Sequence, residues 1–245
     1  MKRSLVPVVG LLVACGTGLA QQLHVYGPEG PAVPMKECAA MYSKRTHLQV
    51  VVTSGPEKNW MGEAAQDADL IFGGAEYMLT EFGMQHPGFL AAGSRQELYP
   101  RAFGIVVRRD NPKRIRGLRD LARPGVKLLD MNAAGQLGAW EDLAGRRGLI
   151  PGIEGNIALS VETSAEATEA WKTRPDLDAW MTYVSWGRRL GDDAKVVQLP
   201  IEERIYRGTP IAVAARTTQR ALAEGFVKFL KSPQAHAVFV RWGWD

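Results

Sequence analysis

Five short segments of small and polar residues have the composition of loops that bind a small anion. They span residues 27–31, 53–56, 73–76, 132–136 and 183–186, and each contains Gly, Ser, Asn or Gln. Small residues let backbone N–H groups approach a ligand, and the positive end of a following helix favours an anion. Each segment alone would serve as a turn or a helix cap. Because all five are expected at strand ends, together they favour one shared ligand cleft.

Two arginines are the charged side chains best suited to hold that anion. Arg101 and Arg207 lie where we expect the chain to cross between two lobes, and a guanidinium binds an oxyanion through paired hydrogen bonds. A hinge or surface ion pair would explain either arginine as well. Glu76 would repel an anion, unless the ligand also carries an amine. The predicted ligand-binding residues are Tyr26, Gly27, Pro28, Gly30, Ser54, Gly55, Gly74, Glu76, Arg101, Asn132, Gly135, Gln136, Tyr183, Trp186, Tyr206 and Arg207.

Catalytic and metal-binding patterns are poorly represented. The four histidines are scattered, and none has a second ligand three or four residues away that would form a metal site. The chain lacks the nucleophile elbow G-x-S-x-G, the phosphate loop G-x-x-x-x-G-K-[ST] and the dinucleotide motif G-x-G-x-x-G. We therefore predict a protein that is not an enzyme and uses no metal or cofactor. The alternative is a secreted enzyme with Glu76 or Asp130 as acid or base, which requires a buried carboxyl with a raised pKa beside the cleft.

The elements that must position these residues follow an α/β pattern. Strand-forming runs at 23–26, 48–52 and 69–72 are each followed by a loop and a helix-forming segment. This order is typical of a mainly parallel sheet that helices cover on both faces. A second series of alternating strands and helices occupies residues 126–184, and two amphipathic helices follow within 221–242.

A long apolar strand at 100–107 separates the two series and predicts a two-lobed organisation. We assign the first lobe to residues 22–104 plus 205–245, and the second lobe to the inserted segment 105–204. Two extended crossings would connect the lobes, one at this strand and one near 203–212.

The N-terminus has the pattern of a secretory signal peptide. Lys2 and Arg3 precede an apolar run of about eleven residues, the length of a signal-peptide core and too short to span a membrane. Small residues before the expected cleavage site predict a signal peptide of residues 1–20. Alternatively, residues 1–14 form a lipoprotein signal and Cys15 carries the lipid. Either processing route predicts an exported, periplasmic protein.

Composition and charge exclude several other classes of protein. Of the 245 residues, 46% are hydrophobic and 23% are charged, which excludes a disordered chain. The formal net charge of +4 falls to +2 without Lys2 and Arg3, so bulk charge gives no support to a nucleic-acid partner. The basic run at 108–119 is better explained as a solvated surface turn, because an exported protein rarely meets nucleic acid. Two cysteines, Cys15 and Cys38, are too few for a disulfide framework.

Five segments together carry a family resemblance. They are the turn at 27–31, TSGP at 53–56, DLIFGGAEYM at 69–78, the crossing at 106–129 and the closing helices at 226–244. These segments resemble the type II, molybdate-binding-like class of extracytoplasmic solute-binding proteins. The resemblance implies the periplasmic-binding-protein type II fold, in which two α/β lobes close on one small ligand.

A narrower resemblance rests on three further segments. VYGPEGPA at 25–32, NAAGQLGAWEDLAGRRG at 132–148 and RIYRGTPIAV at 204–213 are most similar to accessory colonization factor C-type proteins. The class resemblance implies a monomer that delivers an inorganic oxyanion or a short carboxylate to the membrane permease of an ABC-type importer. The family name adds the alternative of an adhesion or chemoreceptor-docking protein.

Overall fold

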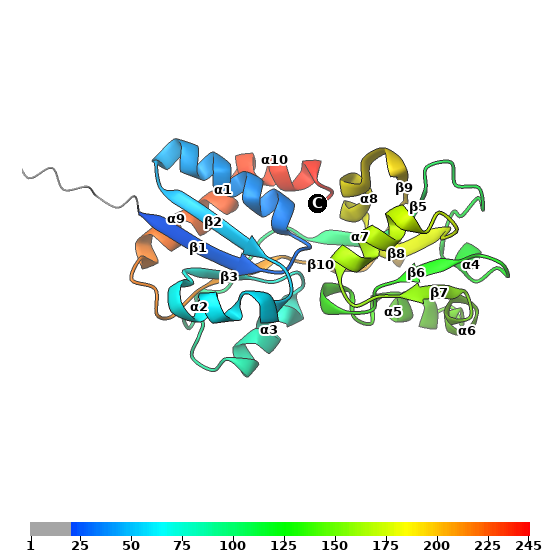
Figure 1. Cartoon of the computed structure of the whole chain (residues 1–245), viewed down its shortest axis with the longest axis horizontal. Helices are drawn as coiled ribbons and strands as arrows, with labels where there is room; N and C mark the ends of the chain where they lie inside the picture. Colours follow the sequence, from blue (N-terminus) through cyan, green and yellow to red (C-terminus); the bar gives the residue numbers. More distant parts are fainter. Residues whose placement is uncertain (1–20) are drawn as a thin grey trace, which may run out of the picture.

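Two β-sheets, each flanked by helices, lie along the long axis of the molecule in the computed structural model, which describes residues 21–245 (Figure 1). Each sheet with its helices is called a lobe below. The α/β class and the two-lobed arrangement predicted from the sequence are confirmed, while the residue bounds of the lobes stay a prediction. The predicted signal peptide of residues 1–20 and the alternative lipidation of Cys15 lie outside the described residues.

The first lobe contains a five-stranded sheet with the strand order β2-β1-β3-β11-β4. Strand β1 runs parallel to β2 and β3, whereas β11 is antiparallel to β3 and β4. The strands are β1 (Gln22–Gly27), β2 (Gln49–Ser54), β3 (Leu70–Phe72), β4 (Gln96–Glu97) and β11 (Pro210–Val213). The helices are α1 (Ala32–Thr46), α2 (Met61–Asp67), α3 (Glu76–Gln85), α9 (Arg220–Leu230) and α10 (Pro233–Arg241), with a short 3-10 turn η1 (Glu57–Asn59).

Both faces of the first sheet are buried against helices. Successive side chains of a strand point to opposite faces, and neighbours in β1 accordingly join different hydrophobic clusters. Val25 packs with Met35 of α1 and Phe226 of α9, while Tyr26 packs on the other face with Trp60. This two-sided burial is what three consecutive strand–loop–helix units require.

The second lobe contains a six-stranded sheet with the order β10-β5-β8-β6-β7, and β9 also pairs with β5. Strand β6 is parallel to β7 and β8, but β5 is antiparallel to β8, β9 and β10. The strands are β5 (Arg101–Arg108), β6 (Leu128–Asp130), β7 (Ile157–Ser160), β8 (Ala179–Tyr183), β9 (Ala194–Val197) and β10 (Tyr206–Arg207). The helices are α4 (Leu118–Leu121), α5 (Ala139–Gly145), α6 (Ile150–Glu154), α7 (Ser164–Thr173) and α8 (Val184–Leu190), with 3-10 turns η2 (Ala134–Gln136), η3 (Gly191–Asp193) and η4 (Ile201–Glu203).

The helix predicted over 137–148 is shorter than expected. Helix α5 ends at Gly145, and Gly148 then takes a left-handed conformation with a φ of 64°. Pro151 lies in the first turn of the next helix, α6, where its missing N–H costs nothing. Local backbone chemistry therefore ends the predicted helix early, and α6 begins beyond it as a separate helix.

The C-terminus ties down both crossings between the lobes. The backbone N–H of Asp245 donates to the carbonyl of Pro100 at 2.9 Å, just before β5. The indole of Trp244 donates to Thr209 Oγ1 at 3.0 Å, between β10 and β11. Because β5 and β10 also pair with each other, the two crossings and the chain end form one connected hinge region.

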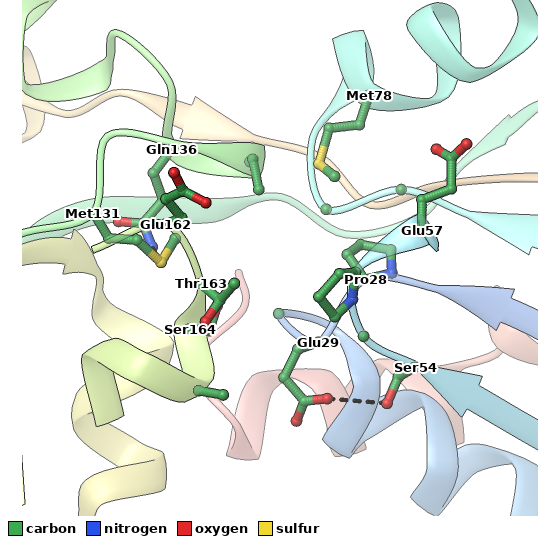
Figure 2. Close-up of a pocket in the computed structure, with 18 of the residues that line it drawn as sticks. Pro28, Glu29, Ser54, Glu57, Met78, Met131, Gln136, Glu162, Thr163 and Ser164 are labelled. Atoms are coloured by element: carbon green, nitrogen blue, oxygen red, sulfur yellow. Dashed lines mark hydrogen bonds between the residues drawn. The ribbon is translucent and has the colours of Figure 1, made fainter. Parts of the chain in front are cut away.

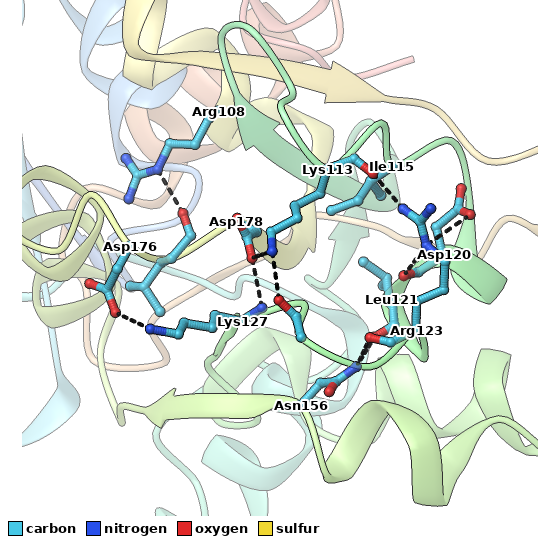
Figure 3. A network of polar contacts seen from close by, with 12 residues as sticks. Arg108, Lys113, Ile115, Asp120, Leu121, Arg123, Lys127, Asn156, Asp176 and Asp178 are labelled. Carbon is cyan, nitrogen blue, oxygen red and sulfur yellow. Dashed lines mark hydrogen bonds and ion pairs between the residues drawn. The ribbon is translucent and has the colours of Figure 1, made fainter.

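Lys113 of the basic run at 108–119, and Lys127 beyond the run, pair with acidic side chains of the second lobe. Lys113 Nζ lies 3.9 Å from the carboxylate of Asp178, and Lys127 Nζ lies 3.3 Å from that of Asp176 (Figure 3). Their basic groups thus have acidic partners within the protein. That the run at 108–119 is not a nucleic-acid surface stays a prediction.

Within residues 21–245, no helix is long and apolar enough to cross a membrane. The same residues contain no group of three or more His, Cys, Asp or Glu side chains that could hold a metal ion.

Candidate ligand-binding cleft

A cavity of about 710 Å³ lies between the two lobes. In the first lobe it is lined by the segments that follow β1, β2 and β3, and in the second by the 131–136 segment, the start of α7 and part of α8. Figure 2 shows Pro28, Glu29 and Met78 on one side, and Gln136 and Thr163 on the other. This is the place at which ligands bind in open α/β sheets, beyond the carboxyl ends of the strands.

Arg101 is the buried charge of this cleft. Its side chain is only 2% exposed, and its Nη2 atom donates to the carbonyl of Gly74 at 2.8 Å. Its Nε and Nη1 atoms have no hydrogen-bond partner among residues 21–245, and no carboxylate in that range forms an ion pair with it. A buried charge without a partner is costly. An anionic ligand would supply the missing acceptors.

Aromatic packing and burial define the surroundings of Arg101. Its Cζ atom lies 3.9 Å from the centroid of the Tyr183 ring and 5.2 Å from that of Trp244. Burial is the main cause that lowers the pKa of Arg101 to about 10, and the charge of Arg189 adds to the effect. The guanidinium therefore remains a cation at neutral pH, fixed in place by rings rather than by an acid.

Three glycines enclose the Arg101 guanidinium. A Cβ atom at Gly30 would lie 3.0 Å from its Nη1 atom, and a Cβ atom at Gly74 or Gly135 would lie 3.5 Å from Nη2. A Cβ atom at Gly135 would also lie 3.0 Å from the carbonyl oxygen of Gly74 in the opposite lobe. Larger side chains at Gly30 or Gly135 would therefore push the backbone away from the cation or from the other lobe.

Two tyrosines hold the η2 segment of the second lobe. Tyr183 donates its hydroxyl to the carbonyl of Gly135, and Tyr77 of the first lobe donates to the carbonyl of Ala134. Burial raises the pKa of Tyr183 to about 12, so the hydroxyl stays protonated and able to donate. The loop that covers Arg101 is thus fastened from both lobes.

One ion pair joins the lobes across the cleft. Arg189 of α8 donates from Nη2 to Glu29 Oε1 at 2.9 Å and from Nη1 to the Glu29 carbonyl at 3.2 Å. The other carboxylate oxygen of Glu29 accepts from Ser54 Oγ at 3.0 Å, as Figure 2 shows. Arg189 also stacks on Trp186, with its Cζ atom 4.1 Å from the ring centroid. We call the Arg189–Glu29 pair the interlobe latch.

The start of α7 faces the cavity with a closed capping box. Thr163 Oγ1 accepts from the N–H of Glu166 at 3.2 Å, and the Glu166 carboxylate accepts from the N–H groups of Thr163 and Glu162 at 2.9 and 3.1 Å. The T-x-x-E pattern at 163–166 is the sequence signature of this cap. The Glu166 carboxylate already compensates much of the partial positive charge at this helix N-terminus. Arg101 is therefore the stronger candidate to hold an anion.

Nine of the sixteen predicted residues line the cavity, and seven do not. Those that line it are Pro28, Gly30, Ser54, Gly55, Gly74, Arg101, Gly135, Gln136 and Trp186. Those that lie elsewhere are Tyr26, Gly27, Glu76, Asn132, Tyr183, Tyr206 and Arg207. The assignment of the first group to ligand binding stays a prediction.

Three polar side chains of the second group have partners within the protein instead. Tyr26 donates to Asp67 Oδ1 at 2.7 Å from within the hydrophobic core. Asn132 shapes its own loop, since its Oδ1 accepts from the N–H of Gly138 at 2.7 Å. Glu76 accepts from the N–H of Gly208 at 2.6 Å, so its carboxylate fastens the second crossing.

The other members of the second group also make packing contacts or hydrogen bonds within the protein. A Cβ atom at Gly27 would lie 2.5 Å from the carbonyl oxygen of Phe72, so this glycine allows close strand packing. Tyr183 supports Arg101 from behind, as described above. Arg207 donates from Nη1 to the carbonyl of Tyr206 at 3.2 Å, and Tyr206 accepts from Arg204 at 3.5 Å.

Several residues that line the cavity are not among those predicted from the sequence. They include Glu29, Trp60, Met78, Thr163, Ser164 and Arg189. Glu29 falls inside a predicted loop, and the capping signature marks Thr163. Arg189 has no local signal, because it reaches the cleft only through the packing of one lobe against the other.

The comparisons with known proteins agree with this geometry. Residues 23–245 match the family model for the bacterial extracellular solute-binding protein. The solved structure of PEB3 from Campylobacter jejuni is 28% identical, with a TM-score of 0.81, and the match covers 91% of this chain and 98% of PEB3. A structure of PEB3 with bound L-phospholactate gives the same identity and coverage and a TM-score of 0.82.

Two relatives that are named for the anions they bind are more distant. A sulfate-binding protein of Synechococcus elongatus is 26% identical over a 160-residue alignment, and the match covers 57% of this chain but only 45% of that relative. The molybdate-binding protein of Azotobacter vinelandii shares the fold at 17% identity, with a TM-score of 0.70 and coverage of 91% of this chain and 98% of that chain. The chain thus belongs to the family of bacterial extracellular solute-binding proteins, in its type II class.

Proposed function

We propose that the protein captures a small anion in the cleft between its lobes, with Arg101 as the anion anchor. One observation carries the proposal: a guanidinium that is 2% exposed lines the cleft with two nitrogen atoms unpartnered within residues 21–245. An anion placed there would accept charge-assisted hydrogen bonds, which are about twice as strong as neutral ones. The sulfate-binding relative and the L-phospholactate bound by PEB3 support the same class of ligand.

Ligand capture would work by favouring the closed arrangement of the lobes. Arg101 extends from the second sheet, and Gly30 and Gly74, which enclose it, belong to the first lobe. A ligand held between them gains contacts only when the lobes are together, so it shifts the population toward the closed state. Delivery to the permease of an ABC-type importer, in the periplasm, is the use that the family membership favours.

Calorimetric titration of the purified protein tests this proposal. Sulfate, molybdate, phosphate, citrate and L-phospholactate are the probes, and we expect at least one dissociation constant below about 1 mM. Absence of heat with every probe up to millimolar concentration would contradict anion capture.

The enzyme alternative has one supporting observation. Burial and the neighbouring Glu141 raise the pKa of the Asp130 carboxyl to about 6, as an acid or base at that position would require. Asp130 does not, however, line the cavity, and Glu76 is engaged by Gly208. Neither carboxyl therefore belongs to the lining of the cavity beside Arg101, and binding without turnover remains the proposed function.

A further inference from the structure

The cavity is much larger than an inorganic oxyanion needs. Its volume of about 710 Å³ falls in the range of about 300–1,000 Å³ that is typical of sites for organic ligands. A sulfate or molybdate ion at Arg101 would fill a small part of it. The remaining space would then hold water, which requires polar partners to be stable there.

Much of that remaining space adjoins an apolar surface. Trp60, Ile71, Phe72, Met78, Leu79 and Phe82 of the first lobe line it, and we call this set the apolar wall; Met78 is its part-exposed member, and the other five residues are at most 4% exposed. Met78 is half-buried, and Figure 2 shows its side chain projecting from α3 into the space between the lobes. Water against such a surface finds few hydrogen-bond partners, whereas an apolar group gains by leaving solvent.

The charges of the cavity are arranged for a single acidic group. Arg101 is the buried member of the charged residues that line it, and it lies inside the glycine enclosure. Arg189 is neutralised by Glu29 in the latch. Glu162 and Glu169 are exposed at the rim, where Lys172 is also exposed. A second acidic group on the ligand would thus meet more carboxylates than free cations, and like charges in contact are costly.

We propose that the ligand is an organic anion with one acidic group and an apolar body, the acidic group against Arg101 and the body against the apolar wall. This inference rests on the proposed function, and it narrows the ligand class. It excludes inorganic oxyanions as the preferred ligands. The acidic group is a carboxylate, a sulfonate or a sulfate ester, since Arg101 hydrogen-bonds to the oxygens that these groups share.

Two series of simple anions test the inference by calorimetry. One compares methanesulfonate with 1-butanesulfonate, the other compares acetate with pentanoate, and sulfate is measured beside them. Each buried methylene group is expected to tighten binding about fourfold, so the three added groups give roughly sixtyfold. The same gain in at least one series, with sulfate weaker than the longer member, is the expected result.

Two methionines on one helix provide a matched pair of variants. Met78→Ser removes an apolar contact from the wall and should reduce the gain between the short and the long anion about tenfold. Met84→Ser is the control, because Met84 is also on α3 but is 75% exposed and does not line the cavity. This control should keep the whole gain.

The outcomes separate the two proposals. If sulfate binds more tightly than every organic probe, or if chain length has no effect, the apolar-body inference is overturned and anion capture stands. If neither sulfate nor any organic anion binds, the proposed function itself fails. An equal loss in Met78→Ser and Met84→Ser would also overturn the role of the apolar wall.

Discussion

Each end of strand β5 carries an arginine, and the two arginines differ in their hydrogen-bond partners. Arg101 is buried and Arg108 is half-buried. Both stack on an aromatic ring at the same distance, with the Cζ atom of Arg101 3.9 Å from the Tyr183 centroid and that of Arg108 3.9 Å from the Trp171 centroid. Arg108 donates from Nε to the carbonyl of Leu177 and from Nη1 to that of Trp171, each at 2.7 Å. Arg101 has one carbonyl partner and two nitrogens without any among the described residues.

The difference shows that Arg108 finds its hydrogen-bond partners within the protein, whereas Arg101 finds only one within residues 21–245. Arg108 lies beside the C-terminal end of α7, where a cation satisfies free carbonyls and interacts favourably with the helix dipole; Figure 3 shows it among the polar contacts of that region. Arg101 lies at the cleft end of the same strand. Identical chemistry thus stabilises the fold at one end and, in our proposal, binds the ligand at the other.

Replacing Arg101 should have the largest effect on binding. Arg101→Met keeps the approximate length of the side chain but removes the cation, and we expect at least a hundredfold loss of affinity for the tightest anion found. Because the unpaired charge is costly to bury, the variant should be as stable as the parent protein or more so. Titration calorimetry and thermal unfolding without ligand measure the two effects. Unchanged affinity would remove Arg101 from the site.

Replacing Arg108 in the same way should give the opposite pattern. Arg108→Met leaves the carbonyls of Trp171 and Leu177 without a donor, and we expect a loss of about 2 kcal/mol in the free energy of unfolding. Anion affinity should change less than threefold, since Arg108 does not line the cavity. Urea unfolding and titration of the same preparation test both statements. A stable variant with lost binding would reverse the comparison.

The sequence predicts the fold better than it predicts the two arginines' roles. Strand–loop–helix order is local, and so the parallel parts of both sheets follow from runs such as 23–26 and their flanking turns. In β5, by contrast, every residue from Arg101 to Val107 is buried. Without a two-residue alternation, the pattern cannot show which side chain faces a cleft. The sequence therefore predicts the same role for Arg101 and Arg207, although only Arg101 of the two lines the cavity.

Residues brought together by the packing of the two lobes are the least predictable part of the site. Ser54 ends strand β2 and Gly55 follows it, so local strand and turn signals suffice to predict that both lie at the cavity. Arg189 lies 160 residues from its partner Glu29, and no spacing rule connects them. Ligand choice depends on such interlobe contacts. The narrower resemblance to accessory colonization factor C-type proteins stays a prediction.

A buried acid tests whether an unpartnered charge always marks a ligand site. Asp130 has an oxygen without a partner among the described residues but does not line the cavity. Its pKa, raised to about 6 by burial and by Glu141, exceeds that of an unfolded aspartate. The folded protein therefore takes up a proton as the pH falls through 6, whereas the unfolded chain does so only near 4, and folding becomes more favourable over that window.

We expect the Asp130 effect on stability to be about 1 kcal/mol between pH 7 and pH 5. Asp130→Asn should remove this part of the pH dependence while leaving anion binding intact. Urea unfolding of both proteins at the two pH values measures the difference. Identical pH dependence in the two proteins would show that the Asp130 carboxyl does not titrate in this range.

The interlobe latch should have the smallest effect, because the Arg189–Glu29 ion pair is part-exposed and neither residue is the proposed anion anchor. The Arg189 and Glu29 side chains are 18% and 36% exposed, and such pairs contribute about 0.2–1 kcal/mol. Arg189→Gln should therefore speed ligand dissociation two- to fivefold in stopped-flow experiments, since the latch exists only while the lobes are together. Arg147→Gln is the control, because its pair with Glu203 at 2.8 Å is similarly shielded but lies outside the cavity lining. Equal dissociation rates in the two variants would mean that the latch contributes to folding alone, and Arg189 would then belong with Arg108 rather than with Arg101.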